Sequence, residues 1–238
     1  MASCPGWRPA WLDHSDHTPA READLGAVPR LGAVARLEEM FAPGESPFRA
    51  KGTIYQGLVA STDARCPGGT AAVLASLDDD ALRAFYDQQF LAASWYDLLP
   101  LIPFSHAAAR VAGIAHVAYA KEGARFHAAR DINGVHRFFL KLASPKMVAV
   151  RLPRLMMQYF NFGRAEGKAT GEKSFEVVGR AIPEPVCAWF VTVIEGFVPA
   201  AMQHAGARSI VARTDPPEPD GFAHGVPLVR SRLALTWT

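Results

Sequence analysis

Apolar residues at helical spacing mark several segments in the first two thirds of the chain. In residues 81–91, Leu82, Phe85 and Tyr86 fall on one helical face, and the acidic run before them supplies capping residues. A further helix is expected from Pro145, a residue type favoured in the first turn, through Phe160. The segment starting at Gly52 fits either a strand or the first turns of a helix, because its periodicity does not decide between them.

The apolar stretch 90–104 is too short and too interrupted for a membrane helix. A spanning helix needs about 20 apolar residues, whereas this run contains Asp97, Pro100 and Pro103. The two prolines favour extended backbone at the residues that precede them. We therefore expect an apolar elbow here, followed by a helix that begins near Ser105.

Strand-like alternation of apolar and polar positions begins after residue 161. Residues 163–170 and 173–180 predict a hairpin. A very apolar helix follows and ends near Gly206, a suitable C-cap. Two final strands are expected at 207–212 and 228–237, separated by a proline-rich loop. This order, helices-β-β-α-β-β, predicts an α+β fold in which an N-terminal helical bundle packs on a small antiparallel sheet.

The beginning of the chain has a different composition from the rest. It lacks long apolar periodicity, and one short amphipathic piece at 31–41 is its clearest helical pattern. Its prolines are Pro5, Pro9, Pro19, Pro29, Pro43 and Pro47. We interpret residues 1–47 as a proline-rich, partly disordered extension and residues 48–238 as a single α+β domain.

Composition is consistent with a globular protein that has a sizeable core. Half of the 238 residues are apolar and one fifth are charged, and the net charge of +2 gives no reason to expect nucleic acid or an anionic membrane as partner. The three cysteines, Cys4, Cys66 and Cys187, predict neither a disulfide framework nor a zinc site. Together with the lack of a secretory pattern at the start, this favours a cytoplasmic location.

Basic residues are concentrated between positions 121 and 168. Ten Lys and Arg residues stand there against three acidic ones. This excess predicts either an ordinary solvated face or a surface that accepts an acidic partner or an anionic ligand. The basic-face candidates are Arg130, Arg137, Lys141, Arg151 and Arg154.

Signatures of common enzymes are not found in the sequence. It has no P-loop, G-x-G-x-x-G, G-x-S-x-G or C-x-x-C pattern, so we predict no catalytic residue, metal site or cofactor. His106, His116, His127 and His136 could suggest a metal cluster. If one helix carried His116 and His127, however, they would share a face at a separation of about 16 Å. That is too far for one metal ion, whose ligand atoms lie about 2 Å away.

A group of mostly aromatic residues provides candidates for a ligand pocket. Cys187 is otherwise expected to be a small buried hydrophobe, and Glu195, inside the apolar helix, is expected to face solvent or to be buried with a partner. Gly196 should allow another backbone to approach closely, as in helix-on-sheet packing. The pocket candidates are Trp95, Tyr96, Phe104, His136, Cys187, Trp189, Phe190 and Glu195.

Three hypotheses for function follow. The first is a non-catalytic domain, sensory or regulatory, that binds a small apolar or amphipathic molecule between helices and sheet. The second is a protein-interaction module that forms a homodimer or docks an acidic partner without any ligand. The third is an enzyme with an unfamiliar site.

Several segments of the chain resemble a known family. They are Lys51-Gly52, the Phe90-to-Tyr96 step that ends in Ser-Trp-Tyr, residues 130–145, Gly163-Arg164-Ala165, Cys187-Ala188-Trp189, Ile194-Glu195-Gly196 and residues 225–237. These resemble a paralogous family of uncharacterised proteins abundant in myxobacteria, and the resemblance covers roughly Phe48 to Thr238.

The order of the elements is also similar to a fold shared by vinyl-reductase-type domains, haem nitric-oxide sensor domains and vesicle-tethering subunits. That likeness implies a domain that binds a small ligand or pairs as a dimer. Val229 stands near the position where a vinyl-reductase-type cysteine is often found, and the Tyr-x-Ser-x-Arg pattern of the haem sensors is not recognisable. The likeness therefore implies neither a zinc site nor haem binding, and fold alone does not give function.

Overall fold

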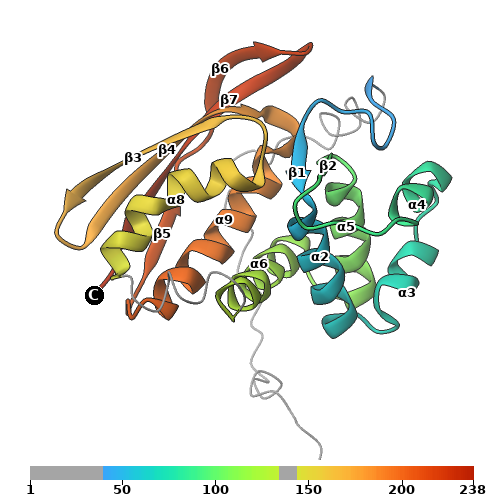
Figure 1. Ribbon diagram of the computed structural model, residues 1–238, viewed down its shortest axis with the longest axis horizontal. Coiled ribbons are helices and arrows are strands. Elements are labelled where there is room, and N and C mark those ends of the chain that lie inside the picture. The colour runs from blue at the N-terminus through green and yellow to red at the C-terminus, as the bar shows by residue number, and fades with distance from the viewer. Residues whose placement is uncertain (1–39, 134–143) are drawn as a thin grey trace, which may run out of the picture.

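The N-terminal half of the protein is a bundle of helices with a small two-stranded sheet at one end (Figure 1). The computed structural model describes residues 40–133 and 144–238. In the first range the elements are β1 (Arg49–Lys51), α2 (Gly52–Arg65), α3 (Gly69–Ala75), α4 (Asp80–Tyr86), β2 (Trp95–Asp97), α5 (Leu101–Ala112) and α6 (His116–Asn133). The segment that begins at Gly52 is thus a helix throughout.

Local sequence chemistry explains where several of these helices begin. The carboxylate of Asp79 accepts a hydrogen bond from the backbone N–H of Leu82 at 3.0 Å and so caps α4, as the acidic run predicts. The expected elbow at Pro100 and Pro103 is wrong, because α5 already begins at Leu101. Both prolines are compatible with this start, since the first N–H groups of a helix have no partner within it.

A buried aromatic cluster forms the core of the N-terminal half. Tyr55 stacks on Phe90 with ring centroids 4.3 Å apart, and Tyr86 stacks on Phe104 at 4.5 Å. Beside them, the fully buried Asp97 accepts hydrogen bonds from the backbone N–H groups of Gly44, Ser46 and Leu99. Its carboxylate therefore ties the segment before β1 to β2.

The C-terminal half consists of an antiparallel sheet and two long helices. Its elements are α8 (Pro145–Tyr159), β3 (Arg164–Gly171), β4 (Ser174–Pro183), α9 (Glu184–His204), β5 (Val211–Thr214), β6 (Glu218–Ala223) and β7 (Val226–Thr236). Strands run in the order β3-β4-β7-β5, and β6 also pairs with β7. The predicted hairpin is therefore β3–β4, and the predicted apolar helix is α9.

Two strands of this sheet differ from the sequence expectation. Strand β5 covers Val211–Thr214 instead of residues 207–212, and β6 was not expected. The stretch expected as a loop contains β6, which pairs with the first part of β7 in a hairpin that extends beyond the rest of the sheet (Figure 1). Proline cannot donate to a strand ladder, which makes a segment with Pro219 look like a loop in sequence. The strand is possible because β6 lies at the edge of the sheet and its register shifts between Pro219 and Phe222.

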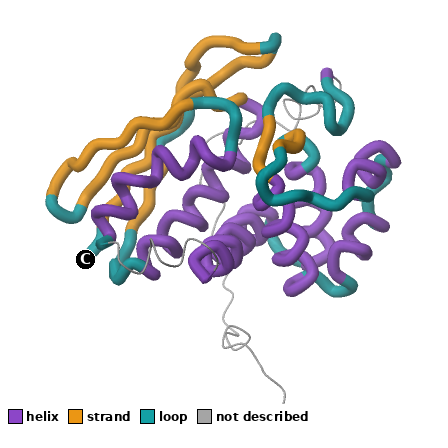
Figure 2. The backbone as a smooth tube through the Cα atoms, in the orientation of Figure 1, coloured by secondary structure: helices purple, strands orange, loops and turns teal. Residues whose placement is uncertain are grey.

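The C-terminal half has two layers, visible in Figure 2 as purple helices against orange strands. Helices α8 and α9 pack on one face of the sheet, where Phe175, Val177, Leu233 and Leu235 are buried. The other face is polar, and there Glu176 pairs with Lys168 and Arg232. This alternation is what a sheet with one buried face requires.

Helix α9 is the one described helix long and apolar enough to cross a membrane by length and composition. Half of its most apolar window is buried within the protein, where it packs against α6, α8 and the sheet. It therefore has the environment of a core helix. The α+β prediction is confirmed, and the division at residue 47 stays a prediction.

Candidate functional site

An apolar cavity of about 90 Å³ lies where the two halves of the protein meet. Its walls come from α2, α6, α8 and α9, with one residue from α5. We call it the junction cavity. It is lined by Ile54, Gly57, Leu58, Ser61, Ser105, Tyr119, Ala120, Gly123, Ala124, His127, Leu152, Leu155, Met156, Tyr159, Phe160, Trp189, Val193, Ile194, Phe197 and Val198.

Glycines allow the helices around this cavity to approach closely. A Cβ atom on Gly57 would lie 1.8 Å from Nδ1 of His127, so the imidazole ring occupies the space that any other residue would need. On α9, a Cβ atom on Gly196 would lie 2.5 Å from the carbonyl oxygen of Lys121. The close approach expected at Gly196 is therefore between α9 and α6, and not between helix and sheet.

His127 is buried within the cavity wall. Its ring centroid lies 6.2 Å from those of Tyr159 and Phe197, so aromatic rings of α8 and α9 surround it. The arrangement places one imidazole of the N-terminal half against the C-terminal half. Polar character in this cavity is otherwise limited to a few hydroxyl groups.

A serine and two histidines lie next to each other at the α5 side of the cavity. Ser105 Oγ lies 3.0 Å from Nε2 of His116, and the His116 ring stacks on His106 with centroids 3.6 Å apart. Burial, followed by the nearby His106, lowers the pKa of His116 to about 4. Burial and Arg110 lower the pKa of His106.

This serine–histidine pair does not have the properties of a catalytic dyad. An imidazole with such a low pKa is a weak general base, and its ring faces another imidazole where a catalytic base has an orienting carboxylate. Ser105 also lies within α5, where backbone N–H groups are used in the helix and cannot stabilise an oxyanion. Among the described residues, no group of three or more His, Cys, Asp or Glu could hold a metal ion.

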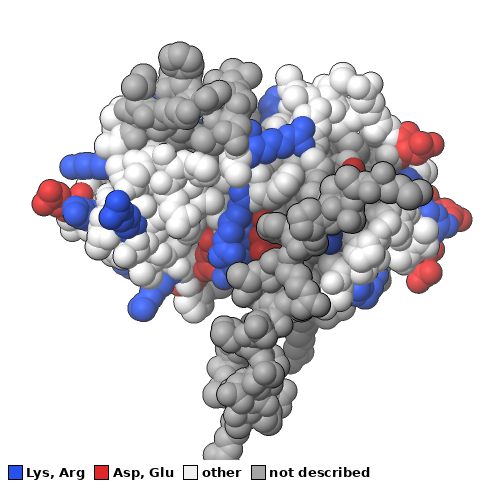
Figure 3. All heavy atoms as spheres, turned by 90° about the horizontal axis from the view of Figure 1, so that it is seen from below, with Lys and Arg blue, Asp and Glu red and all other residues white. Residues whose placement is uncertain are grey.

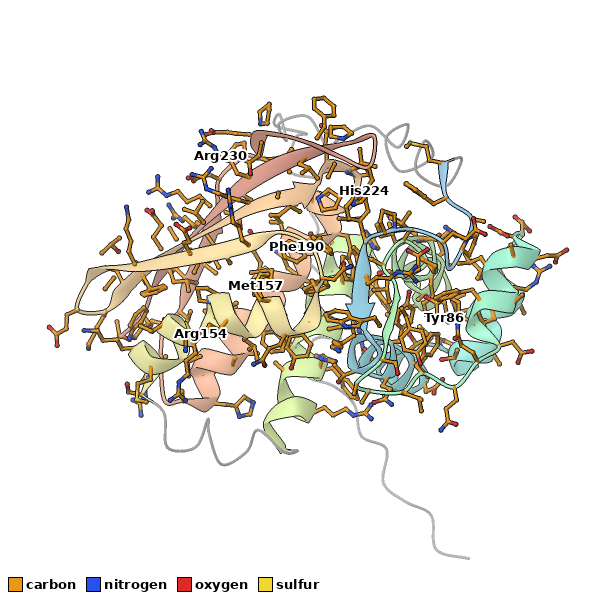
Figure 4. The ribbon with its side chains drawn as sticks, turned by 45° about the horizontal axis from the view of Figure 1, so that its top comes forward. Tyr86, Arg154, Met157, Phe190, His224 and Arg230 are labelled. Carbon is orange, nitrogen blue, oxygen red and sulfur yellow. The ribbon has the colours of Figure 1, made fainter. Side chains whose placement is uncertain are left out.

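A second, smaller cavity of about 50 Å³ lies between α8, α9 and the sheet. We call it the sheet cavity. Met156, Phe160 and Ile194 line both cavities, so the two share a wall. Figure 4 labels Met157 on α8 and Phe190 on α9, two further residues of the sheet cavity. Its polar lining includes Ser231 on β7, whose hydroxyl oxygen is buried and has no hydrogen-bond partner in the described part of the chain.

The structure distributes the sequence-predicted pocket residues over several places. Trp189 lines the junction cavity and Phe190 the sheet cavity. Phe104 and Tyr96 belong to the aromatic core of the N-terminal half, and Trp95 is exposed beneath the ammonium group of Lys51. These three do not line either cavity.

The remaining pocket candidates differ in environment. Cys187 is buried in the core, where burial and the nearby Glu184 raise the pKa of its thiol to about 11. That shift makes the thiol unreactive at neutral pH. Glu195 has partners, since one oxygen pairs with Lys121 Nζ at 2.7 Å and the other accepts a hydrogen bond from Thr214 at 2.8 Å. His136 lies outside the described residues.

Three of the five basic-face candidates lie among the described residues. Arg130 on α6 donates to the carbonyl oxygen of Gln56, and Arg151 and Arg154 are exposed on α8. Figure 4 labels Arg154 on that helix. Arg137 and Lys141 lie outside the described residues. Seen from below in Figure 3, Lys and Arg side chains are spread among uncharged ones, and no single basic patch dominates the described part of this face.

Sequence reasoning missed most walls of the junction cavity. Residues of α2 such as Ile54 and Leu58 were not recognised because the periodicity of their segment did not identify a helix. A usable signal was present in α6, where Ala120, Gly123 and Ala124 place small residues along one helical face. Small residues at that spacing lie on one face of α6 and allow neighbouring helices to pack close to it, so that they can enclose a cavity together.

Comparison with known proteins gives a fold relationship. No protein-family model and no curated protein matches the sequence. Solved structures do match: an oxygen-binding H-NOX domain related to soluble guanylate cyclases aligns at TM-score 0.57 and 12% identity, over 79% of this chain and 95% of that one. The chain shares the H-NOX fold.

Two further H-NOX structures give the same result. One, from a study of haem distortion in the H-NOX family, aligns at TM-score 0.59 and 12% identity, over 79% of this chain and 95% of that one. A mutant of the T. Tengcongensis H-NOX aligns at TM-score 0.57 and 11% identity, over 79% and 97%. The expected likeness to haem-sensor domains is thus confirmed for the fold, and the myxobacterial resemblance stays a prediction.

Proposed function

We propose that the protein is a non-catalytic, sensory or regulatory domain that binds a small apolar molecule in the junction cavity. The observation that carries this proposal is the position and lining of that cavity. Almost all of its surface is apolar, with a few hydroxyl groups and one imidazole that can orient a ligand. The shared fold with small-molecule sensors adds support by analogy.

The position of the cavity suits a sensory role. Its walls belong to both halves of the protein, so a bound molecule contacts α2 and α6 on one side and α8 and α9 on the other. A ligand shifts a conformational equilibrium only if it binds one arrangement better than another. A ligand that contacts both halves will have different affinities for arrangements in which the halves pack differently.

Haem is the subject of two of the matched structural studies. It does not fit the residues present in this cavity. A cavity of about 90 Å³ is far smaller than the roughly 300–1,000 Å³ of pockets that enclose even drug-sized ligands. Its described lining also contains no Lys or Arg to pair with the two haem propionates. We therefore assign the cavity to a smaller, uncharged molecule.

The proposal can be tested with a small apolar probe molecule and a substitution that fills the cavity. Toluene serves as the probe, since it is a small uncharged molecule of the kind that apolar cavities bind. We expect toluene to raise the thermal midpoint of the wild-type protein, because a ligand that binds only the folded state stabilises it. Gly123 lines the cavity, and a Cβ atom there would lie 3.5 Å from Oγ of Ser61, another lining residue. We therefore expect the side chain of Gly123→Leu to take up cavity space and the shift to disappear.

Gly123→Ala is the matched control. It has the same change in backbone freedom, and its Cβ atom meets nothing closer than 3.4 Å. It should keep the toluene response. No response in the wild-type protein, or an equal response in Gly123→Leu, would contradict the proposed function.

A second candidate function is the docking of an acidic protein segment on α8. The helix has no acidic residue, and Lys146, Arg151 and Arg154 accompany the exposed Met147 and Val150 on its surface. Such a face complements an acidic segment with apolar anchors. Reversal of charge in Arg151→Glu/Arg154→Glu should abolish binding of an acidic peptide and leave the toluene response unchanged.

A further inference from the structure

The sheet cavity exists because two small residues face each other on the buried side of the sheet. Gly179 on β4 and Ser231 on β7 are register partners. The neighbouring pairs on the same face are large: Val177 with Leu233, and Phe175 with Leu235. The short side chain at Ser231 leaves space beneath α8 and α9, while Ile182 partly fills the space over Gly179, where a Cβ atom would lie 3.2 Å from Ile182 Cδ1.

The hydroxyl group of Ser231 is buried without a hydrogen-bond partner in the described part of the chain, which is unfavourable for stability. The residue is 8% exposed, and its oxygen has no hydrogen-bond partner among the described residues. A buried polar group without a partner is destabilising relative to one that is hydrogen-bonded. An alanine at this position would avoid that cost, so the hydroxyl group is available to a molecule in the cavity.

The wall between the two cavities is adaptable. Met156 lines both of them, and a methionine side chain is unbranched and changes rotamer readily. Phe160 and Ile194 complete the shared wall. Met156 is therefore the residue of this shared wall that can change conformation most readily.

The charged residues near the sheet cavity do not require a charged ligand there. Arg164 and Arg180 border the sheet cavity, but strand alternation puts Arg180 on the face opposite Gly179, where it pairs with Asp220. Arg164 is the register partner of Arg180 and shares that face. The rest of the interior is formed mostly by apolar side chains such as Phe190 and Leu233, and the hydroxyl group of Thr214 already donates to Glu195.

We propose that the junction and sheet cavities form one elongated site, and that Ser231 holds the single hydrogen-bonding group of the ligand. This inference rests on the proposed function and names its ligand class. The ligand is an uncharged molecule with an apolar body about as large as benzene and one hydroxyl or carbonyl group. The body occupies the junction cavity, and the polar group passes Met156 to reach Ser231.

Benzyl alcohol and toluene are suitable probes because they differ by one hydroxyl group. Binding is measured by titration of protein labelled with ¹³C at the methionine methyl groups. The chain has six methionines, of which Met156 lines both cavities and Met157 only the sheet cavity. Benzyl alcohol should shift both signals, and toluene mainly that of Met156.

Ser231→Ala removes the hydroxyl group and should fold at least as well as the wild type. We expect it to weaken benzyl alcohol binding about fivefold, the equivalent of one neutral hydrogen bond, with no change for toluene. Ser94→Ala, a substitution in the N-terminal half away from both cavities, should change neither affinity. Ser231→Leu fills the sheet cavity and should abolish the Met157 shift while toluene still binds.

The outcomes separate the two proposals. If benzyl alcohol binds the wild type and Ser231→Ala equally, the Ser231 hydroxyl group does not hold the ligand, and the inference is overturned while the proposed function stands. If toluene binds but benzyl alcohol never shifts Met157, the cavities are separate and the inference is again overturned. If neither probe binds the wild-type protein, both proposals fail.

Discussion

At the scale of single residues, Asp97 makes the clearest structural contribution. One carboxylate oxygen accepts from the N–H groups of Gly44 and Ser46, and the other accepts from Leu99. Asp97→Asn replaces one acceptor by an NH₂ donor that faces a backbone N–H group. We expect the free energy of unfolding to fall by about 2 kcal/mol in urea titrations. The exposed Asp87→Asn should have no such effect, and equal stability of the two variants would contradict this role.

The stacked His106 and His116 predict a pH dependence of stability. Their pKa values are lower in the folded protein than the ordinary value of 6.5, so the folded chain binds fewer protons than the unfolded chain. Stability should therefore be complete above about pH 6.5 and should decline as the pH falls toward 4.

The double variant His106→Gln/His116→Gln removes this contribution. Its unfolding free energy should decrease less than that of the wild type between about pH 7 and pH 4.5, as measured by urea titration at each pH. His204→Gln, on the exposed end of α9, serves as a control and should follow the wild type. A parallel decrease in all three proteins would exclude the histidine pair as the cause.

At the scale of elements, the contact between α2 and α6 gives opposite predictions for two glycines. Gly57→Ala forces a Cβ atom into the His127 ring and should lower the unfolding free energy by about 1–3 kcal/mol. Gly123→Ala meets only side-chain atoms at 3.4 Å or more and should raise it by up to about 1 kcal/mol through helix propensity. Urea titrations of both variants measure the change in unfolding free energy. If both substitutions stabilise the protein, or both destabilise it, the packing described for α2 and α6 is contradicted.

Elements with strong local patterns were predictable, and those set by tertiary context were not. The β3–β4 hairpin and α9 follow from alternation and from a long apolar run. The first turn of α5 was missed because Pro103 disfavours a helix at the preceding residue in isolation, whereas packing of Leu101 and Ile102 in the core stabilises it. Strand β6 was missed because pairing with β7 overrides its prolines.

At the scale of the whole molecule, Lys121 and Glu195 connect the two halves. Their ion pair joins α6 to α9, and the two side chains are 33% and 22% exposed. A double-mutant cycle with Lys121→Met and Glu195→Gln should give a coupling free energy of about 1 kcal/mol. The more exposed Arg230–Glu218 pair should give a smaller coupling free energy. A larger coupling for Arg230–Glu218 than for Lys121–Glu195 would contradict the role of the Lys121–Glu195 pair in joining the two halves.

The candidate site was less predictable than the fold. Aromatic residues were a reasonable guide to a pocket, yet Phe104 and Tyr96 pack into the core because the N-terminal half needs large rings to fill it. Trp189 was identified because it lies on the apolar face of α9. Its neighbours across the cavity, such as Leu58 and Met156, come from helices whose mutual position no local pattern specifies.

The wide sequence separation of the junction cavity walls has a consequence for how the site arises. Ile54 on α2 and Val198 on α9, which are far apart in the sequence, border the same space. No short contiguous peptide contains the proposed site, because its walls come from α2, α6, α8 and α9. If the cavity binds a molecule as proposed, binding requires that α9 has been synthesised and has docked, and a substitution that delays this docking would also delay binding.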